Sequence, residues 1–549
     1  MSTLAAPDRG GHPGPASAAA CFAIACLVTA GAALALGQDA NWDLQNYHYY
    51  TAWAWWHGRT FGPDLGAAQV QTYHNPLLHL PFFAMVSAQW PPRLIAIVLT
   101  LPAAWSAFVV AMLARALFAN AATPERWTFV TAAVVIGMTS AMGVGALGNT
   151  MGEWVLAACV LTALWCCVGG IESTRSRRAT VAMIVVAGIV AGLATGLKLT
   201  AGTPTLALCL ALAFRGPWSR SGLRTGVVQS FWFATGVVAG AAASYGGWGL
   251  ELWRHFGNPV FPYFNHVFAS PWWESTQVPQ PHAYGPGGLL GWLAFPFILA
   301  APPLFMVAEV PFRDPRLAAV TTLAILAAVV HARRRPAPAG AMAAQTPREG
   351  VPAQAWRLLA LFAAMAFVLW AYQHAIYRYL LVVDALSGLL AVGLVRRAFP
   401  GRLAAAAAVV LTLMLVAATR PADWGRVPFG ERWFEPKVRL PQLAPDALVL
   451  VTTGEAVAYL IPLLGAAPRY VAALNTLVHP DRPTRLTQEV DAIVRDHRGS
   501  FYQLTFPLTE GREVIAAHGL ARTQACAVIV TNMPTSPIEL CRLVRRSTP

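Results

Sequence analysis

Four charged side chains of the sequence stand in apolar surroundings, where a charge is costly unless it has a function. Asp43 follows the first long apolar run, Glu153 follows the turn-like stretch GNTMG, Lys198 lies in GLKLTAGTP and Arg378 lies in YRYLL. A carboxylate can act as a general base on a hydroxyl group. Cations can stabilise the charge that develops on a departing phosphate. The four residues together therefore indicate transfer chemistry on a substrate with a phosphate head.

Lys198 is informative because the chain uses lysine so rarely. It has 37 arginines and only two lysines. An ammonium is a compact point charge, whereas a guanidinium is a planar fork that grips a phosphate with two hydrogen bonds. We therefore expect Lys198 and Arg378 to bind the donor phosphate and Asp43 and Glu153 to be catalytic. The structural alternatives are an N-cap for Asp43, a solvated loop acid for Glu153, a snorkelling cation for Lys198 and an interface anchor for Arg378.

The composition predicts a membrane protein that places these residues in loops between helices. The chain is 56% hydrophobic and 12% charged, about half the charged share of a soluble domain. Apolar runs long enough to span a bilayer recur from residue 18 to 419. The net charge of +14 comes mostly from short loops, where basic residues set orientation. Nucleic-acid binding is therefore not expected.

The basic loops mark the cytoplasmic side and leave the four charged residues on the opposite side. We predict an all-α polytopic bundle of about eleven transmembrane helices in a bacterial inner membrane, with the site facing the periplasm. The predicted number of spans depends on how residues 288–308 are interpreted. Their prolines and the preceding GPGG favour an interfacial or re-entrant segment, while a full span would give twelve helices and a cytoplasmic tail.

The chain divides into a transmembrane domain, 18–419, and a C-terminal domain, 420–549. In the latter, β-rich runs such as DALVLVTT and SFYQLTFPL alternate with helical ones, which predicts a small periplasmic α/β domain. A cytoplasmic tail, two outer loops and a cytoplasmic linker complete the scheme, at residues 1–17, 38–92, 251–288 and 333–355.

The outer loop 38–92 begins with NWDLQNYHYYTAWAWWHG, whose spacing predicts a helix and whose aromatic residues suit the membrane surface. Polar and aromatic side chains of the two outer loops and of the YRYLL segment could line a groove for the acceptor or the sugar. These candidates are Tyr47, His48, Gln71, His74, Asn75, Asn258, Asn265, His266 and Tyr377.

Cys526 and Cys541 are the only cysteines of the tail, and turn-forming residues lie between them. An outer compartment permits disulfides, so we predict a Cys526–Cys541 disulfide. Two small buried residues on separate elements are the alternative.

The motifs also resemble a known family. The acid of the first outer loop, NPLLHLPFF (75–83), the acid of the second outer turn, GLATGLKLTAGTP (192–204) and YRYLL (377–381) together look like the GT-C superfamily of integral-membrane glycosyltransferases. That group includes protein O-mannosyltransferases, aminoarabinose transferases and polyprenol-phosphate-mannose-dependent mannosyltransferases. The resemblance covers most of residues 18–419.

The resemblance implies an inverting transfer of a sugar, a hexose or a pentose, from a polyprenyl-phosphate donor. The acceptor would be a hydroxyl of a glycan, a lipid or a protein. Asp43 would match the catalytic acid of the first loop, Glu153 the second acid, and Lys198 and Arg378 the phosphate contacts. The sequence departs from the family's paired acids, because Leu44 follows Asp43. No metal or other cofactor is therefore expected, and the histidines show no metal-ligand spacing. The main alternative is a transporter or flippase of lipid-linked saccharides, which needs cations but no base.

Overall fold

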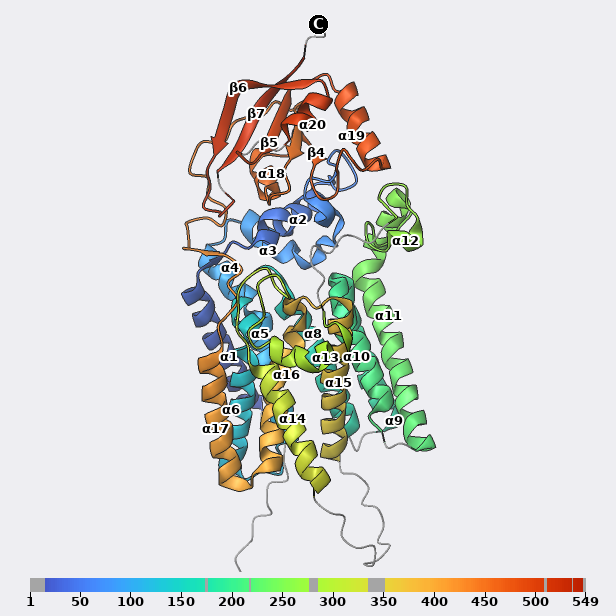
Figure 1. The fold of residues 1–549 in the computed structure, drawn as a ribbon, viewed down its shortest axis with the longest axis vertical. Helices are drawn as coiled ribbons and strands as arrows, with labels where there is room; N and C mark the ends of the chain where they lie inside the picture. Colours follow the sequence, from blue (N-terminus) through green and yellow to red (C-terminus); the bar gives the residue numbers. More distant parts are fainter. Residues whose placement is uncertain are drawn as a thin grey trace, which may run out of the picture.

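The computed structural model describes residues 15–172, 176–216, 219–275, 285–333, 351–507, 511–535 and 537–546. The predicted tail 1–17 and linker 333–355 lie largely outside these residues, as does part of the loop 251–288. A bundle of long helices carries a smaller sheet domain at one end (Figure 1). The longer helices of the bundle are α1 (Pro15–Leu36), α4 (Pro92–Leu99) continued by α5 (Leu101–Leu117), α8 (Glu153–Glu172), α9 (Arg177–Leu197), α11 (Arg220–Phe256), α14 (Arg316–Arg333), α15 (Val351–Gln373), α16 (Leu381–Ala398) and α17 (Gly401–Ala418).

Nine helical segments of the described chain are long and apolar enough to cross a membrane. Two shorter helices, α6 (Thr123–Met138) and α10 (Gly202–Phe214), lie along the same axis (Figure 1). Counted together with the nine, these two helices would give the eleven spans that the sequence predicts. The apolar helix α13 (Gly288–Ile298) has 11 residues, about 17 Å, and lies across the bundle (Figure 1), as expected for an interfacial segment.

Helices α9 and α11 pack closely through small residues repeated every four positions. A Cβ atom at Gly188 would lie 2.1 Å from the carbonyl oxygen of Phe233, and one at Gly240 would lie 2.1 Å from that of Ile189. Small residues at such spacing let two membrane helices approach closely. The same row continues to Gly196, two residues before Lys198. The packing of α9 against α11 therefore fixes the position from which Lys198 extends.

The C-terminal domain is a five-stranded mixed sheet with the order β4-β3-β5-β7-β6. Strands β3 (Leu448–Thr452), β4 (Arg469–Leu474) and β5 (Phe501–Thr505) are parallel, and β7 (Ile538–Arg545) joins β5 and β6 (Leu520–Ile529) in antiparallel pairs. Helices α18 (Ile461–Leu464), α19 (Arg485–Asp496) and α20 (Arg512–Ala517) accompany the sheet. This arrangement is the predicted small α/β domain.

The outer loop 38–92 lies between the bundle and this sheet (Figure 1). Its strand β1 (Gln38–Asp39) pairs with β2 (Arg426–Val427), and Leu65 pairs with Val471 at the edge of the sheet. Arg59 binds Asp64 and the carbonyl oxygens of Ala466 and Pro468. The sheet domain is therefore anchored to the first outer loop along its β4 edge.

This contact corrects the expectation of a helix at the membrane surface. Helix α2 (Tyr49–Trp56) and α3 (Leu80–Ser87) bury their aromatic side chains against the sheet domain. The Tyr49 ring lies 4.7 Å from that of Phe434. The tryptophans at the two ends of the segment, Trp42, Trp55 and Trp56, are exposed. The aromatic residues form an interdomain core because the sheet covers the face that the sequence alone assigns to lipid.

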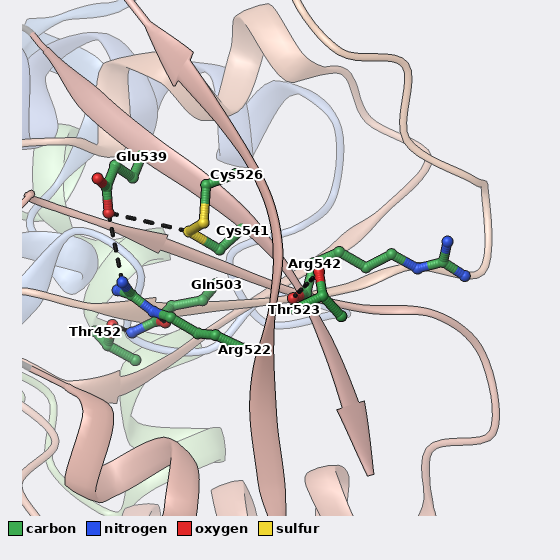
Figure 2. Close-up of a disulfide and its surroundings, with 8 residues drawn as sticks. All are labelled: Thr452, Gln503, Arg522, Thr523, Cys526, Glu539, Cys541 and Arg542. Atoms are coloured by element: carbon green, nitrogen blue, oxygen red, sulfur yellow. Dashed lines mark hydrogen bonds and ion pairs between the residues drawn. A yellow bond between two sulfur atoms is a disulfide. The ribbon is translucent and has the colours of Figure 1, made fainter.

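Cys526 and Cys541 are joined by a disulfide. They lie directly opposite each other on β6 and β7, with Cα atoms 4.0 Å apart. Glu539 and Arg522 lie beside the disulfide (Figure 2). The disulfide therefore joins the edge strand β6 to its neighbour β7.

Candidate active site

Asp43 and Arg378 form the first ion pair of the site. The Arg378 Nη1 donates to the Asp43 Oδ2 at 2.8 Å, and the two side chains are only 15% and 10% exposed. Asp43 makes no capping hydrogen bond; the Asn41 Oδ1 accepts from the Leu44 N–H instead. The N-cap interpretation of Asp43 is therefore wrong, and its carboxylate is available for other interactions.

Local backbone structure aims these two side chains at each other. Asp43 stands at the start of a π-helical turn, Leu44–His48, that leads into α2, and such turns occur often at functional sites. Arg378 lies in a short 3₁₀ helix, Tyr377–Leu380, at the start of α16. Residues 335 positions apart in the chain thus meet at the end of the bundle that faces the sheet domain.

Glu153 and Lys198 form the second ion pair. The Lys198 Nζ donates to the Glu153 Oε1 at 2.6 Å and to the Met151 carbonyl oxygen at 3.3 Å. Glu153 begins α8 directly after Gly152, whose φ of +79° suits glycine. Lys198 follows α9 in an extended conformation. The Glu153 side chain is 3% exposed, so it is not a solvated loop acid.

Tyr379 lies between the two pairs. Both the Lys198 Nζ and the Arg378 guanidinium carbon lie 5.4 Å from the centre of its ring, within the range of a cation–π contact. Glu153 also acts electrostatically on Arg378. The two pairs therefore make one four-charge cluster with zero net charge, which lies largely out of solvent.

Uncharged histidines border this cluster. The Tyr47 ring lies 4.4 Å from that of His48, 5.2 Å from that of His74 and 5.7 Å from that of His79. Burial, followed by the nearby Lys198 charge, lowers the pKa of His74 to about 4. Burial, with neighbouring cations, also lowers the pKa of His48 and of His79 well below the usual value. All three imidazoles are therefore neutral at pH 7, beside two cations.

The structure gives other predicted acceptor residues internal roles. Asn75 donates to the carbonyl oxygens of Gly196 and Ser244, so it holds the loop against the α9–α11 pair. Gln71 accepts a hydrogen bond from the Asn46 amide. These three hydrogen bonds stabilise the first outer loop.

Three other candidates, in the second outer segment and in the 3₁₀ helix before α16, have hydrogen-bond partners inside the fold. The amides of Asn258 and Asn265 are completely buried and bind backbone groups of residues 260–274. His266 is exposed. The Tyr377 hydroxyl donates to Asp314 at 2.9 Å. The polar atoms of Asn258, Asn265 and Tyr377 therefore bind groups of the fold itself, because a buried amide or hydroxyl must find a partner.

Sequence reasoning missed several residues of the site. Tyr379 lies next to Arg378, and His79 lies in NPLLHLPFF, so both stood inside quoted motifs. Tyr263 is less foreseeable: its hydroxyl lies 2.8 Å from the His74 Nε2 although the two residues are 189 positions apart. Burial raises the pKa of Tyr263, which keeps its hydroxyl protonated. No local spacing links these residues.

Within the described ranges, no three His, Cys, Asp or Glu side chains are grouped to hold a metal ion.

No protein-family model matches the sequence, and no curated protein matches it. Solved structures do match the fold. The crystal structure of ArnT from Cupriavidus metallidurans bound to undecaprenyl phosphate is similar with a TM-score of 0.52 and 12% identity, over 96% of this chain and 98% of that chain.

Two further structures are more distant. The apo oligosaccharyltransferase of Archaeoglobus fulgidus has a TM-score of 0.42 and 14% identity, over 89% of this chain and 69% of that chain. The arabinofuranosyltransferase AftD from Mycobacteria has a TM-score of 0.42 and 14% identity, over 97% of this chain and 42% of that chain. The likeness to ArnT shows that this chain shares the fold of that structure over almost its whole length.

Proposed function

We propose that this protein is a membrane glycosyltransferase. It moves a sugar from a polyprenyl-phosphate donor to a hydroxyl acceptor at the periplasmic face of a bacterial inner membrane. The observation that carries the proposal is the four-charge cluster, in which two carboxylates and two cations from four separate segments meet around Tyr379 at one end of the bundle. The ArnT structure that shares the fold is bound to undecaprenyl phosphate.

The two cations suit the phosphate of the donor. Arg378 uses Nη1 for Asp43, while its Nε is buried and has no hydrogen-bond partner among the described residues. A buried donor without a partner is destabilising, and a phosphate oxygen would satisfy it. The Lys198 ammonium, 2.6 Å from Glu153, can approach a second oxygen. The phosphate therefore binds beside Tyr379, within reach of both Lys198 and Arg378.

Donor binding also prepares the base. The phosphate competes with Asp43 for the Arg378 guanidinium, because an anion that binds Nε draws the positive charge away from the carboxylate at Nη1. Displacement leaves a carboxylate that is free to accept a proton. In a single inverting displacement, the acceptor oxygen forms a bond to the anomeric carbon and the bond from that carbon to the phosphate oxygen breaks. The hydroxyl proton passes to Asp43, and polyprenyl phosphate leaves with its charge held by Lys198 and Arg378.

A groove in the bundle suits the polyprenyl tail. A cavity of about 580 Å³ lies between α14, α15 and α16, and its lining is mostly apolar. One lining residue, Val383, follows Arg378 by five positions on the same segment, roughly 8 Å along a helix. A lipid that places its phosphate at Arg378 could therefore extend its first isoprene units into this groove.

The proposal is tested with purified protein in lipid nanodiscs. Radiolabelled hexosyl and pentosyl polyprenyl phosphates are offered with envelope extracts as acceptors, and the transferred label is counted. We expect transfer without any nucleotide sugar and its loss in Asp43→Asn. A protein that moves the labelled lipid across a vesicle membrane but never transfers the sugar would instead be a transporter, and the glycosyltransferase proposal would be wrong.

A further inference from the structure

A buried hydrogen-bond chain leads from Asp39 to His48 through Thr150. Asp39 and His48 are completely buried, and Thr150 is 4% exposed. The Thr150 Oγ1 lies 2.8 Å from the Asp39 Oδ2 and 2.7 Å from the His48 Nδ1. The Thr150 backbone N–H donates to the same Asp39 oxygen at 2.8 Å. Three residues from the first outer loop and the second outer turn are thus linked in a fixed order.

This order determines which nitrogen of His48 carries the proton. A threonine hydroxyl has a single proton, and Asp39 is an acceptor, so that proton points to the Asp39 carboxylate. The Thr150 oxygen must then accept a hydrogen bond from the His48 Nδ1–H. The His48 Nε2 is left with a lone pair. It is buried and has no hydrogen-bond partner among the described residues.

The unpaired Nε2 belongs to the active-site cluster. The His48 ring stacks on that of His79, with centres 4.1 Å apart, and meets the Tyr47 ring edge to face. Lys198 and Arg378 both act electrostatically on it. Burial and these cations lower the pKa of His48 well below its usual value, so the ring stays neutral and is a poor general base.

The chemistry of the missing partner can be stated. A lone pair needs an O–H or N–H donor, and a buried acceptor without one is costly. The polyprenyl chain has no donor, and an ionised phosphate diester has none. In the proposed reaction, the hydroxyl groups of the sugar and of the acceptor are hydrogen-bond donors.

Resting on the proposed function, we infer that His48 is a saccharide-binding residue: its Nε2 accepts a hydrogen bond from a hydroxyl group of the transferred sugar or of the acceptor. Asp39 and Thr150 are positioning residues, because they hold the ring in the tautomer that presents a lone pair. This is the same logic by which a second side chain sets the tautomer of a functional histidine.

Binding of two lipids tests the inference. Undecaprenyl phosphate without sugar, and the glycosylated donor that the wild type turns over, are titrated onto protein in nanodiscs. His48→Phe should bind the bare lipid within twofold of wild type. It should bind the glycosylated donor roughly tenfold more weakly if the donor sugar is the partner. If the acceptor is the partner, both lipid affinities stay normal and the acceptor KM rises by a similar factor.

Two further variants separate this role from a loss of structure. His48→Gln keeps an acceptor near Nε2 and should recover part of the lost affinity. Thr150→Val removes the acceptor for Nδ1–H and should behave like His48→Phe, whereas Thr150→Ser should resemble wild type. If His48→Phe changes neither the affinity for the glycosylated donor nor the acceptor KM, the inference is wrong. If wild type binds neither lipid, it is the glycosyltransferase proposal that fails.

Discussion

At the scale of residues, the site is electrically balanced before any substrate binds. Each of the two cations proposed to bind phosphate lies less than 3 Å from a carboxylate, in surroundings with little solvent. Removing one partner of a buried pair is costly, by about 3–5 kcal/mol, because the other charge is left uncompensated. Variants of single residues therefore combine a loss of chemistry with a loss of stability, and experiments at this site need to separate the two.

Asp43→Asn should lower the transfer rate by at least about 100-fold, because the amide cannot accept the hydroxyl proton. The affinity for undecaprenyl phosphate should stay the same or increase, since Arg378 no longer has a competing anion. Single-turnover transfer and lipid titration measure the two effects. Glu251→Gln is the matched control, because Glu251 is an exposed acid paired with Arg254 and should keep wild-type values. If Asp43→Asn keeps near-normal turnover, Asp43 is not the general base, and Glu153 becomes the candidate for that role.

Lys198→Ala should weaken the binding of undecaprenyl phosphate, because it removes a phosphate contact. It should also lower the melting temperature, because it leaves the buried Glu153 carboxylate without its ion-pair partner. The double variant Lys198→Ala with Glu153→Gln should recover the melting temperature but not the affinity. Lys198→Arg should recover the affinity only in part, since a planar fork replaces a compact charge. Lipid affinity equal to wild type in Lys198→Ala would show that the lysine has a purely structural role.

At the scale of elements, helix packing sets the positions of the charged residues. The small residues of α9 and α11 bring the two helices into backbone contact, and Gly137 on α6 packs equally closely on the Ala385 carbonyl oxygen of α16. Helices α14 and α15 leave a groove over α16 instead. Tight packing on one side of the bundle and a gap on the other agree with a rigid site beside a lipid-binding surface.

Filling the groove should impair the use of the donor lipid. Ala364 lines the cavity and is exposed to it, so Ala364→Trp should raise the donor KM several-fold without disturbing the core. Ala243→Trp, at an exposed position of α11 that does not line the cavity, is the matched control. The comparison is made with donors of long and short prenyl chains. If Ala364→Trp and wild type have equal KM values for the long-chain donor, the prenyl tail does not bind in this groove.

At the scale of the whole molecule, the sheet domain covers the loop that carries Asp43. Leu65 adds to the edge of β4, and Arg59 links the loop to the turn before that strand. On the other side, the Arg485 guanidinium lies 4.5 Å from the ring centre of Trp272 in the second outer loop. The domain therefore contacts both the loop 38–92 and the second outer loop.

Thiol labelling should establish which side of the membrane the sheet domain occupies. In intact spheroplasts, a membrane-impermeant thiol reagent should label the tail only after reduction, because Cys526 and Cys541 are joined in the structure. Cys526→Ser with Cys541→Ser is the control and should abolish the labelling that reduction produces. Labelling of the tail only after cell lysis would contradict both the periplasmic location and an odd number of spans.

The sequence by itself determined the properties that depend on composition and periodicity. Apolar runs recur at bilayer length, basic loops alternate with them, and β-rich segments appear only after residue 420, so the polytopic bundle and the small α/β domain were predictable. The four charged residues were identifiable because a charge inside an apolar region is costly, and this penalty acts locally on each residue. The resemblance of their motifs to a known family also predicted the fold that this chain shares with the ArnT structure.

Only the tertiary structure decided which residues face one another. Asp43 meets Arg378, and Glu153 meets Lys198, across separations of 335 and 45 residues, and no local pattern encodes those pairings. Asn258, Asn265 and Tyr377 look as polar in the sequence as His48 does, yet their polar atoms are satisfied inside the fold. Whether a buried polar group keeps an unused hydrogen-bonding atom depends on every neighbour around it, and those neighbours come from distant parts of the chain.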